Sequence, residues 1–229
     1  MIDPYKFSYL FAVVSVGCFW LYCYWSRPDL RRMLLRISVI FGIGGVTSEF
    51  IYASDWWHPT TLTGTMIGIE DFLFGFFFAG TVAMGYEVVL NKTYQARGER
   101  LSKCRFRYIA LSILALFFGS TLVFGLHSFL ATILAFGLCT AWMLSQRVDL
   151  IPNALFSAAL GCLLGFIFFG APELVTPGWV EATWSFDKLS GHFILHMPLE
   201  DFFWFTAAGA FIGPLIKFRK NYQTKPRTI

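Results

Sequence analysis

Two pairs of adjacent acidic residues stand inside strongly apolar stretches of the sequence. Glu70 and Asp71 lie in MIGIEDFLFGFFFAG, and Glu200 and Asp201 lie in HMPLEDFFWFTAAGA. An ionisable side chain at membrane depth costs several kcal/mol, so it normally faces the protein interior and belongs to a functional path. The pattern indicates acid–base chemistry, in which the two glutamates handle protons and the two aspartates set their protonation.

Aromatic residues follow each acidic pair at the spacing of a helix. Phe74 and Phe77 share a helical face with Glu70, and Trp204 shares one with Glu200. Burial beside aromatic rings, and a second carboxyl group close by, both favour a proton retained on one acid. Aromatic faces stabilise a cation, although such stripes also arise from ordinary packing. The predicted substrate contacts are Phe74, Phe77, Phe202 and Trp204.

Helix capping is the alternative explanation of the acids. Acidic side chains in the first turn of a helix interact favourably with the positive end of its dipole. Pro198, just before Leu199, also suits a helix start. Capping accounts for single acids more readily than for two matched pairs that are each followed by aromatic residues.

The composition indicates an all-α integral membrane protein. The chain has 229 residues, of which 56% are hydrophobic and only 14% are charged, with 27 Phe. Helices of about 17 to 25 apolar residues cross a bilayer. The sequence predicts seven transmembrane helices, and the short GLHSF segment between the fourth and fifth makes one long helix the rival count. The predicted spans are 7–25, 34–52, 66–90, 108–126, 128–145, 153–170 and 198–217.

The basic residues predict that the N-terminus is outside and the C-terminus inside. With this orientation, every Lys and Arg except Lys6 and Lys188 falls on the cytoplasmic side. The net charge of +4 then reflects topology and attraction to anionic membrane lipids, and it implies no nucleic-acid partner. The first apolar stretch lacks a cleavage site, so it is expected to stay in the membrane. The expected location of the protein is the plasma or inner membrane of the cell.

An internal repeat is predicted from landmarks that recur in the same order. Arg-x-Asp-Leu begins at Arg27 and again at Arg147, and each copy is followed by one span, an outer loop and a Glu-Asp helix. The predicted division is a first three-helix repeat at 1–95, a connecting helix four at 96–127 and a second three-helix repeat with a basic tail at 128–229.

The two repeats enter the membrane with the same polarity, because helix four returns the chain to the outside. Parallel repeats of this kind are related by an axis along the membrane normal. The acidic pairs are therefore expected at equal depth, at the outer ends of helices three and seven. They would face each other across a cavity lined by four carboxyl groups.

These motifs resemble the signature of the lycopene cyclase domain family. The segments Ile69-Glu70-Asp71-Phe72 and Pro198-Leu199-Glu200-Asp201 are similar to its Pro-x-Glu-(Glu/Asp) pattern, although Gly68 replaces the first proline and Asp replaces the more usual second Glu. The resemblance implies two tandem three-helix domains, a linear carotene or other isoprenoid lipid as substrate, and membrane lipids as neighbours. It implies redox-neutral ring closure through a carbocation, which needs no cofactor or metal. The oligomeric state stays open.

Three other functions compete with this one. A carotenoid or lipid binder without catalysis would keep the acids for structural reasons. A retinal photoreceptor would need a lysine in the middle of the last span, and Lys217 lies at its inner end. A metal site would use His192, His196 and Glu200, which would align if the segment were helical, but Pro198 interrupts it.

An aromatic belt is expected at the outer membrane interface, formed by Trp56, Trp57, Trp179 and Trp184.

Overall fold

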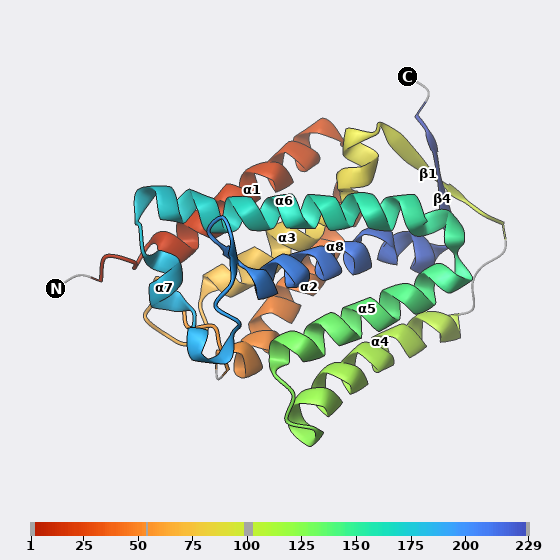
Figure 1. Cartoon of the computed structure of the whole chain (residues 1–229). Coiled ribbons are helices and arrows are strands. Elements are labelled where there is room, and N and C mark those ends of the chain that lie inside the picture. Colours follow the sequence, from red (N-terminus) through yellow and green to blue (C-terminus); the bar gives the residue numbers. More distant parts are fainter. Residues whose placement is uncertain (1–2, 54, 99–102, 228–229) are drawn as a thin grey trace. The chain divides into compact units, whose positions relative to one another are not determined.

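The computed structural model is predominantly helical and describes residues 3–53, 55–98 and 103–227. Figure 1 labels its elements, which follow the chain as long helices separated by short loops. The long helices are α1 (Ser8–Ser26), α2 (Arg31–Tyr52), α3 (Ile69–Val89), α4 (Lys103–Phe118), α5 (Ser128–Gln146), α6 (Ile151–Val175) and α8 (Leu199–Lys220). The shorter elements are a π-helical turn (Gly119–Val123), 3-10 turns at Val148–Leu150 and Phe186–Lys188, helix α7 (Trp179–Thr183), and strands β1 (Lys92–Ala96), β2 (Phe193–Ile194), β3 (Met197–Pro198) and β4 (Tyr222–Pro226).

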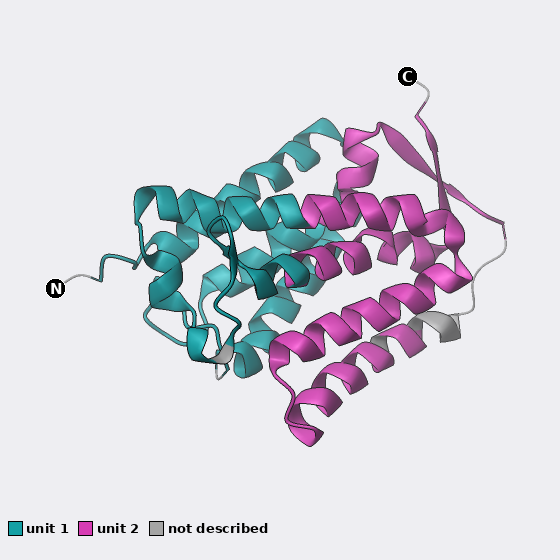
Figure 2. Ribbon diagram, viewed as in Figure 1, with its two compact units in different colours: residues 1–81, 162–203 teal, residues 82–161, 204–229 magenta. Residues whose placement is uncertain are grey.

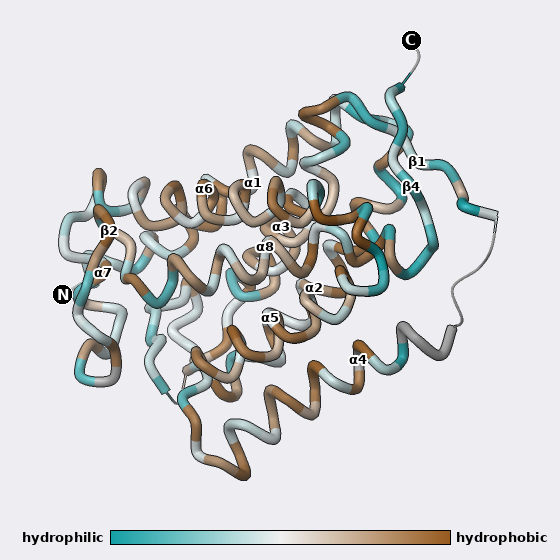
Figure 3. Tube along the Cα trace, turned by 45° about the vertical axis from the view of Figure 1, so that its right-hand side comes forward, coloured by the Kyte–Doolittle hydropathy of each residue, from teal (hydrophilic) through white to brown (hydrophobic). Residues whose placement is uncertain are grey.

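Six of these helices are long and apolar enough to cross a membrane, by length and composition: α1, α2, α3, α5, α6 and α8. Figure 3 shows apolar residues along the helices and hydrophilic residues at β1 and β4. The fourth predicted span, 108–126, is formed by α4 and the π-helical turn, and its apolar part is shorter than the others. The count of seven spans and their orientation therefore stay predictions. Arg100, part of the charge pattern, lies outside the described residues.

The chain forms two compact units, which Figure 2 distinguishes by colour. Unit 1 contains residues 1–81 and 162–203, and unit 2 contains residues 82–161 and 204–229. Helices α3, α6 and α8 each contribute one part to unit 1 and the other part to unit 2. The predicted repeats divide the chain along the sequence instead, and that division stays a prediction.

Glycines allow close contact between helices within each unit. In unit 1, a Cβ atom at Gly45 of α2 would collide with the backbone oxygen of Asp71 in α3. In unit 2, a Cβ atom at Gly209 of α8 would collide with the backbone oxygen of Ser157 in α6. Small residues serve this purpose widely in membrane helices. Gly45 thereby brings α2 against the first acidic pair.

The two Arg-x-Asp-Leu landmarks form the same structure. Arg27 binds Asp29 through Nε and Nη2, at 2.9 and 2.8 Å, and Arg147 binds Asp149 in the same two-pronged way, at 2.7 Å for both bonds. Both arginines are buried. In unit 2, Arg147 also donates to Oδ1 of Asn221 at 2.6 Å. The planar guanidinium therefore joins the turn before α6 to the residue after α8, with donors on separate nitrogens that an ammonium group lacks.

We expect Arg147→Lys to lower the free energy of unfolding by about 1.5–3 kcal/mol, because charge-assisted bonds are lost at a buried position. Chemical unfolding in detergent measures the change. The matched control is Arg36→Lys, which alters an exposed arginine of α2 and should leave stability unchanged. Equal stability of the two variants would contradict the structural role of the two-pronged contact.

Candidate functional site

Both acidic pairs occupy the first turn of a long helix in unit 1. Glu70 and Asp71 begin α3, and Glu200 and Asp201 begin α8. Their exposed fractions are 0%, 2%, 9% and 4%, in that order. The four acids are therefore shielded from bulk water, and the protein itself must supply their hydrogen-bond donors.

Each glutamate holds the loop that precedes its own helix. The backbone N–H of Leu62 donates to Oε1 of Glu70 at 2.6 Å, and the backbone N–H of Ser190 donates to Oε1 of Glu200 at the same distance. The second oxygen of each glutamate, Oε2, is buried and has no hydrogen-bond partner among the described residues. Each glutamate thus combines one oxygen bound to the backbone with one that has no partner among the described residues.

The aspartates bind different donors in the two copies. Asp71 accepts the hydroxyl of Tyr9 on Oδ1 and the backbone N–H of Gly68 on Oδ2, both at 2.7 Å. Asp201 accepts the indole Nε1–H of Trp184 at 3.0 Å. The bond from Gly68 is a helix cap, so the capping explanation holds for part of the role of Asp71.

The replacement of the signature proline by Gly68 has two structural consequences. A proline has no backbone N–H, so it could not make the hydrogen bond that Gly68 donates to Asp71 from this position. A Cβ atom here would also collide with Oε2 of Glu70 and with the side chain of Thr61. Position 198, which precedes the second pair at the same distance, is the proline of the signature. The two acidic pairs are therefore equivalent in sequence but different in their hydrogen bonds.

A continuous path of aromatic side chains connects the two aspartates. Tyr9, bonded to Asp71, meets Trp57 edge-on at 5.2 Å between ring centroids, and Trp57 meets Trp184, bonded to Asp201, at 4.4 Å. Three further buried rings pack around this path: Phe168, Phe169 and Trp179. We call these six residues the aromatic cluster. The aromatic cluster therefore links the two aspartates. The expected cavity shared by four carboxyl groups stays a prediction.

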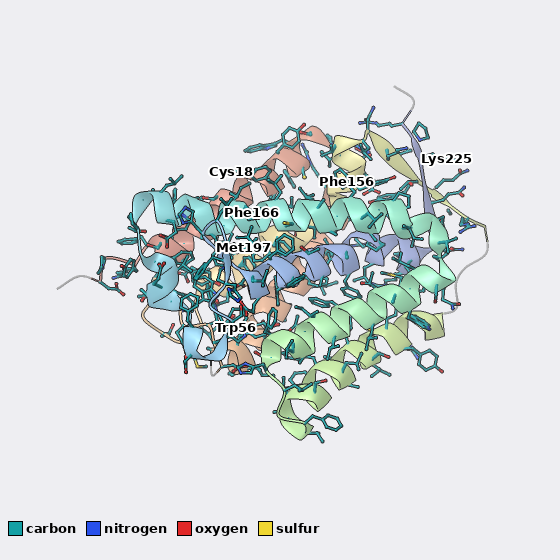
Figure 4. The ribbon with its side chains drawn as sticks, viewed as in Figure 1. Cys18, Trp56, Phe156, Phe166, Met197 and Lys225 are labelled. Carbon is teal, nitrogen blue, oxygen red and sulfur yellow. The ribbon has the colours of Figure 1, made fainter. Side chains whose placement is uncertain are left out.

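The interface belt predicted for four tryptophans is wrong. Trp56, Trp57, Trp179 and Trp184 are only 5%, 7%, 0% and 5% exposed. The loops before α3 and before α8 pair with each other, since the N–H of His58 donates to the oxygen of Thr183 and the N–H of Ser185 donates to that of Trp56, both at 3.0 Å. Figure 4 shows the crowded side chains of this unit, with Trp56 and Met197 labelled.

The predicted substrate contacts are in different surroundings. Phe74 packs against Phe168 at 5.0 Å and so adjoins the aromatic cluster. Phe77 packs against Trp20 of α1 at 5.8 Å. Phe202 lies near Phe166 at 6.4 Å, whereas Trp204 belongs to unit 2 and packs against Phe205 there. The contact with Phe168 places Phe74 beside the cluster. A substrate role stays a prediction for all four residues.

Two polar residues of unit 1 add to the predicted site. Tyr9, on α1, was not predicted, because a lone tyrosine in an apolar helix resembles any other core ring; the sequence signal is its position directly after Ser8, where the second copy has Phe129 after Ser128. Glu49, near the end of α2, is 5% exposed and interacts electrostatically with Asp71. Glu49 is therefore a buried acid that interacts with the first acidic pair.

The hairpin before α8 excludes the helical alignment that a metal site would need. Residues 193–198 form the β2–β3 hairpin, with Leu195 at φ 57°, so His192 and His196 do not share a helical face with Glu200. Among the described residues, no three His, Cys, Asp or Glu side chains gather closely enough to hold a metal ion. A cavity of about 280 Å³ adjoins this hairpin, but it is lined by Glu173, Val180, Glu181, Phe193, Leu195 and His196 and by none of the four acids.

We expect Trp184→Phe to destabilise the protein by about 1–3 kcal/mol more than Trp179→Phe, because only the former strands the buried Asp201 without its donor. Both rings are buried, and the indole N–H of Trp179 has no partner among the described residues. The pair therefore separates loss of a hydrogen bond from loss of ring volume. Thermal unfolding of both variants measures the difference, and equal losses would show that the bond to Asp201 contributes little.

Comparison with known proteins identifies the family. A family model described as lycopene cyclase matches residues 5–89 and 127–218, which together make up well over half of the chain and include both acidic pairs. Comparisons with curated proteins and with solved structures returned no match. The six long apolar helices and this match indicate an integral membrane protein with a carotenoid cyclase-like role. With the acids, the aromatic cluster and the family match in agreement, the chain belongs to the lycopene cyclase family.

Proposed function

We propose that the protein closes a ring at the end of a linear carotene such as lycopene by acid–base catalysis. A proton adds to the terminal double bond, a second double bond of the same chain attacks the resulting carbocation to form the ring bond, and a proton then leaves a neighbouring carbon. One proton enters and one leaves, so the reaction is an isomerisation without redox change. The observation that carries this proposal is the matched geometry of the two buried glutamates.

Glu70 and Glu200 are the proposed proton donor and acceptor. In each, the backbone N–H bonded to Oε1 fixes the plane of the carboxyl group, which leaves Oε2 to exchange the proton with a carbon atom of the substrate. Proton transfer needs such a group within about 3 Å of the reacting atom, and a fixed orientation raises its efficiency.

Asp71 and Asp201 are proposed to set the charge of their neighbouring glutamates. Asp71 accepts two hydrogen bonds, from the backbone N–H of Gly68 at the start of its own helix and from the hydroxyl of Tyr9 on α1. Asp201 receives the indole N–H of Trp184. This difference favours unequal roles for the two pairs, one as the proton donor and the other as the proton acceptor.

The aromatic cluster is proposed to stabilise the carbocation and to keep water from it. Faces of Trp and Tyr attract cations, by about 2 kcal/mol or more where water is excluded. Trp57 and Trp184 are almost fully buried, so the region between the aspartates is shielded from water. Exclusion of water matters because water would capture the cation and yield an alcohol in place of a ring. Phe74, Phe77, Phe202 and Trp204 are proposed to contact the carotene.

The membrane arrangement is part of the proposal. Seven spans, two parallel three-helix repeats and an N-terminus outside would place both acidic pairs near the outer face of the plasma or inner membrane. The basic residues after α3, α5 and α8 support this orientation, and the shared landmarks at Arg27 and Arg147 support the repeat. A carotene, being a lipid, would reach the site from the bilayer.

We expect Glu70→Gln and Glu200→Gln each to lower the formation of cyclic carotene by about 10²-fold or more, because an amide cannot replace the transferred proton. The assay is pigment analysis of cells that accumulate lycopene and express each variant at a matched level. Glu181→Gln, at an exposed acid of the same unit, is the control and should keep the native product. A native chain that binds linear carotene without converting it would show a binding protein and refute the cyclase.

A second expectation concerns orientation. Green fluorescent protein fused after Ile229 should fluoresce, since it folds on the cytoplasmic side, and alkaline phosphatase fused at the same point should be inactive. Alkaline phosphatase inserted in the loop at residues 58–66 should be active, because that loop is predicted to be outside. The reverse pattern would contradict the predicted topology.

A further inference from the structure

A fully buried ion pair lies in unit 2, apart from the residues assigned to the proposed reaction. Lys217 of α8 and Glu87 of α3 are both 0% exposed, and Nζ of Lys217 lies 3.1 Å from Oε1 of Glu87. Nζ also donates to the backbone oxygen of Gly213 at 2.9 Å. The rings of Tyr94 and Tyr86 lie 5.7 and 6.0 Å from it. The ammonium group is therefore held by protein on several sides.

The two partners occupy the same place in the two copies of the sequence. The numbering difference that superimposes Glu70-Asp71 on Glu200-Asp201 is 130 residues, and it also superimposes Glu87 on Lys217. The same difference superimposes Asn91 on Asn221, which have left-handed backbones with φ of 46° and 51°. We call residues 82–96 the first arm and residues 212–226 the second arm. At these equivalent positions, the first arm carries the acid Glu87 and the second arm carries the base Lys217, and the two side chains meet.

The strands of the two arms pair as equivalent elements do around a twofold axis. Strand β1 is antiparallel to β4, and Tyr94 lies opposite Thr224, its own equivalent. Gln95 lies opposite Gln223, and their side chains share a hydrogen bond at 3.4 Å. In such a contact, each residue near the axis meets its own counterpart. Two identical arms would therefore bring Glu against Glu, or Lys against Lys, at a fully buried position.

We propose that Glu87 and Lys217 are a pairing determinant, an ion pair between equivalent positions that lets the first arm pack with the second and rejects either arm packing with its own kind. A buried like-charge pair is strongly unfavourable, since neither charge is compensated. Because the equivalent positions carry opposite charges, only the pairing of a first arm with a second arm makes a neutral contact. Specificity of this kind rests on penalising the wrong partner as much as on attracting the right one.

The first test reverses the charges in the full chain. Cysteines placed by Gln95→Cys and Gln223→Cys should form a disulfide that reports pairing of β1 with β4, detected as the bridged peptide by mass spectrometry. Glu87→Lys or Lys217→Glu alone should lower the bridged fraction at least about tenfold. The double variant Glu87→Lys with Lys217→Glu should restore it, and Lys220→Glu, an exposed charge change in the same helix turn, should not affect it.

The second test asks whether the pair chooses the partner. One full chain carries Glu87→Lys and Gln95→Cys, and the other carries Lys217→Glu and Gln223→Cys. Each chain contains two like-charged arms, but an exchange of arms between the chains makes both contacts neutral. We expect a disulfide-linked dimer of these two chains, and none from the same cysteine variants with native charges. A double reversal that is bridged as poorly as the single ones, or the absence of the linked dimer, would overturn the proposal. No pigment is measured, so the result is independent of the proposed cyclase activity.

Discussion

Carboxyl groups buried among apolar helices must obtain every hydrogen-bond donor from the protein, and this requirement shapes unit 1. Hydrocarbon offers no donors, and an unpaired buried charge costs several kcal/mol. The loops before α3 and α8 meet the requirement by folding back, so that Leu62 and Ser190 present their N–H groups to Glu70 and Glu200. Side chains from elsewhere supply donors to the two aspartates, through Tyr9 and Trp184. The acids therefore hold in place the loops that cover them.

The same requirement is met differently in unit 2. There a buried acid, Glu87, faces a buried base, Lys217. An ion pair requires a residue of opposite charge at one particular position. A backbone N–H, by contrast, is supplied by any residue except proline. Loop contacts can thus be duplicated unchanged in both copies, as at Glu70 and Glu200. An ion pair between equivalent positions requires the two copies to differ.

Much of the fold follows from apolar segment length alone. Helices α1, α5 and α8 begin within one residue of their predicted positions, because hydrophobic stretches of membrane length have few alternative structures. The aromatic cluster was not predicted, since a Trp at a membrane interface and a Trp in a protein core have the same local sequence context. Lys217 was expected to face the cytoplasm for a related reason: a basic residue near the end of a span fits the charge rule whether or not it is buried. Pairing partners such as Glu87, far away in the sequence, leave no local pattern.

The glycine at position 68 gives the repeated acids separate evolutionary constraints. Its N–H and its missing Cβ both serve the first pair, through Asp71 and through Oε2 of Glu70. Proline before the second pair supplies neither, and Trp184 provides a donor there from a different loop. In a relative that carries proline at both positions, the first aspartate would lose its backbone donor and depend on the hydroxyl at position 9, as Asp201 depends on an indole. Proline at position 68 should accordingly be found only where position 9 still supplies a hydrogen-bond donor.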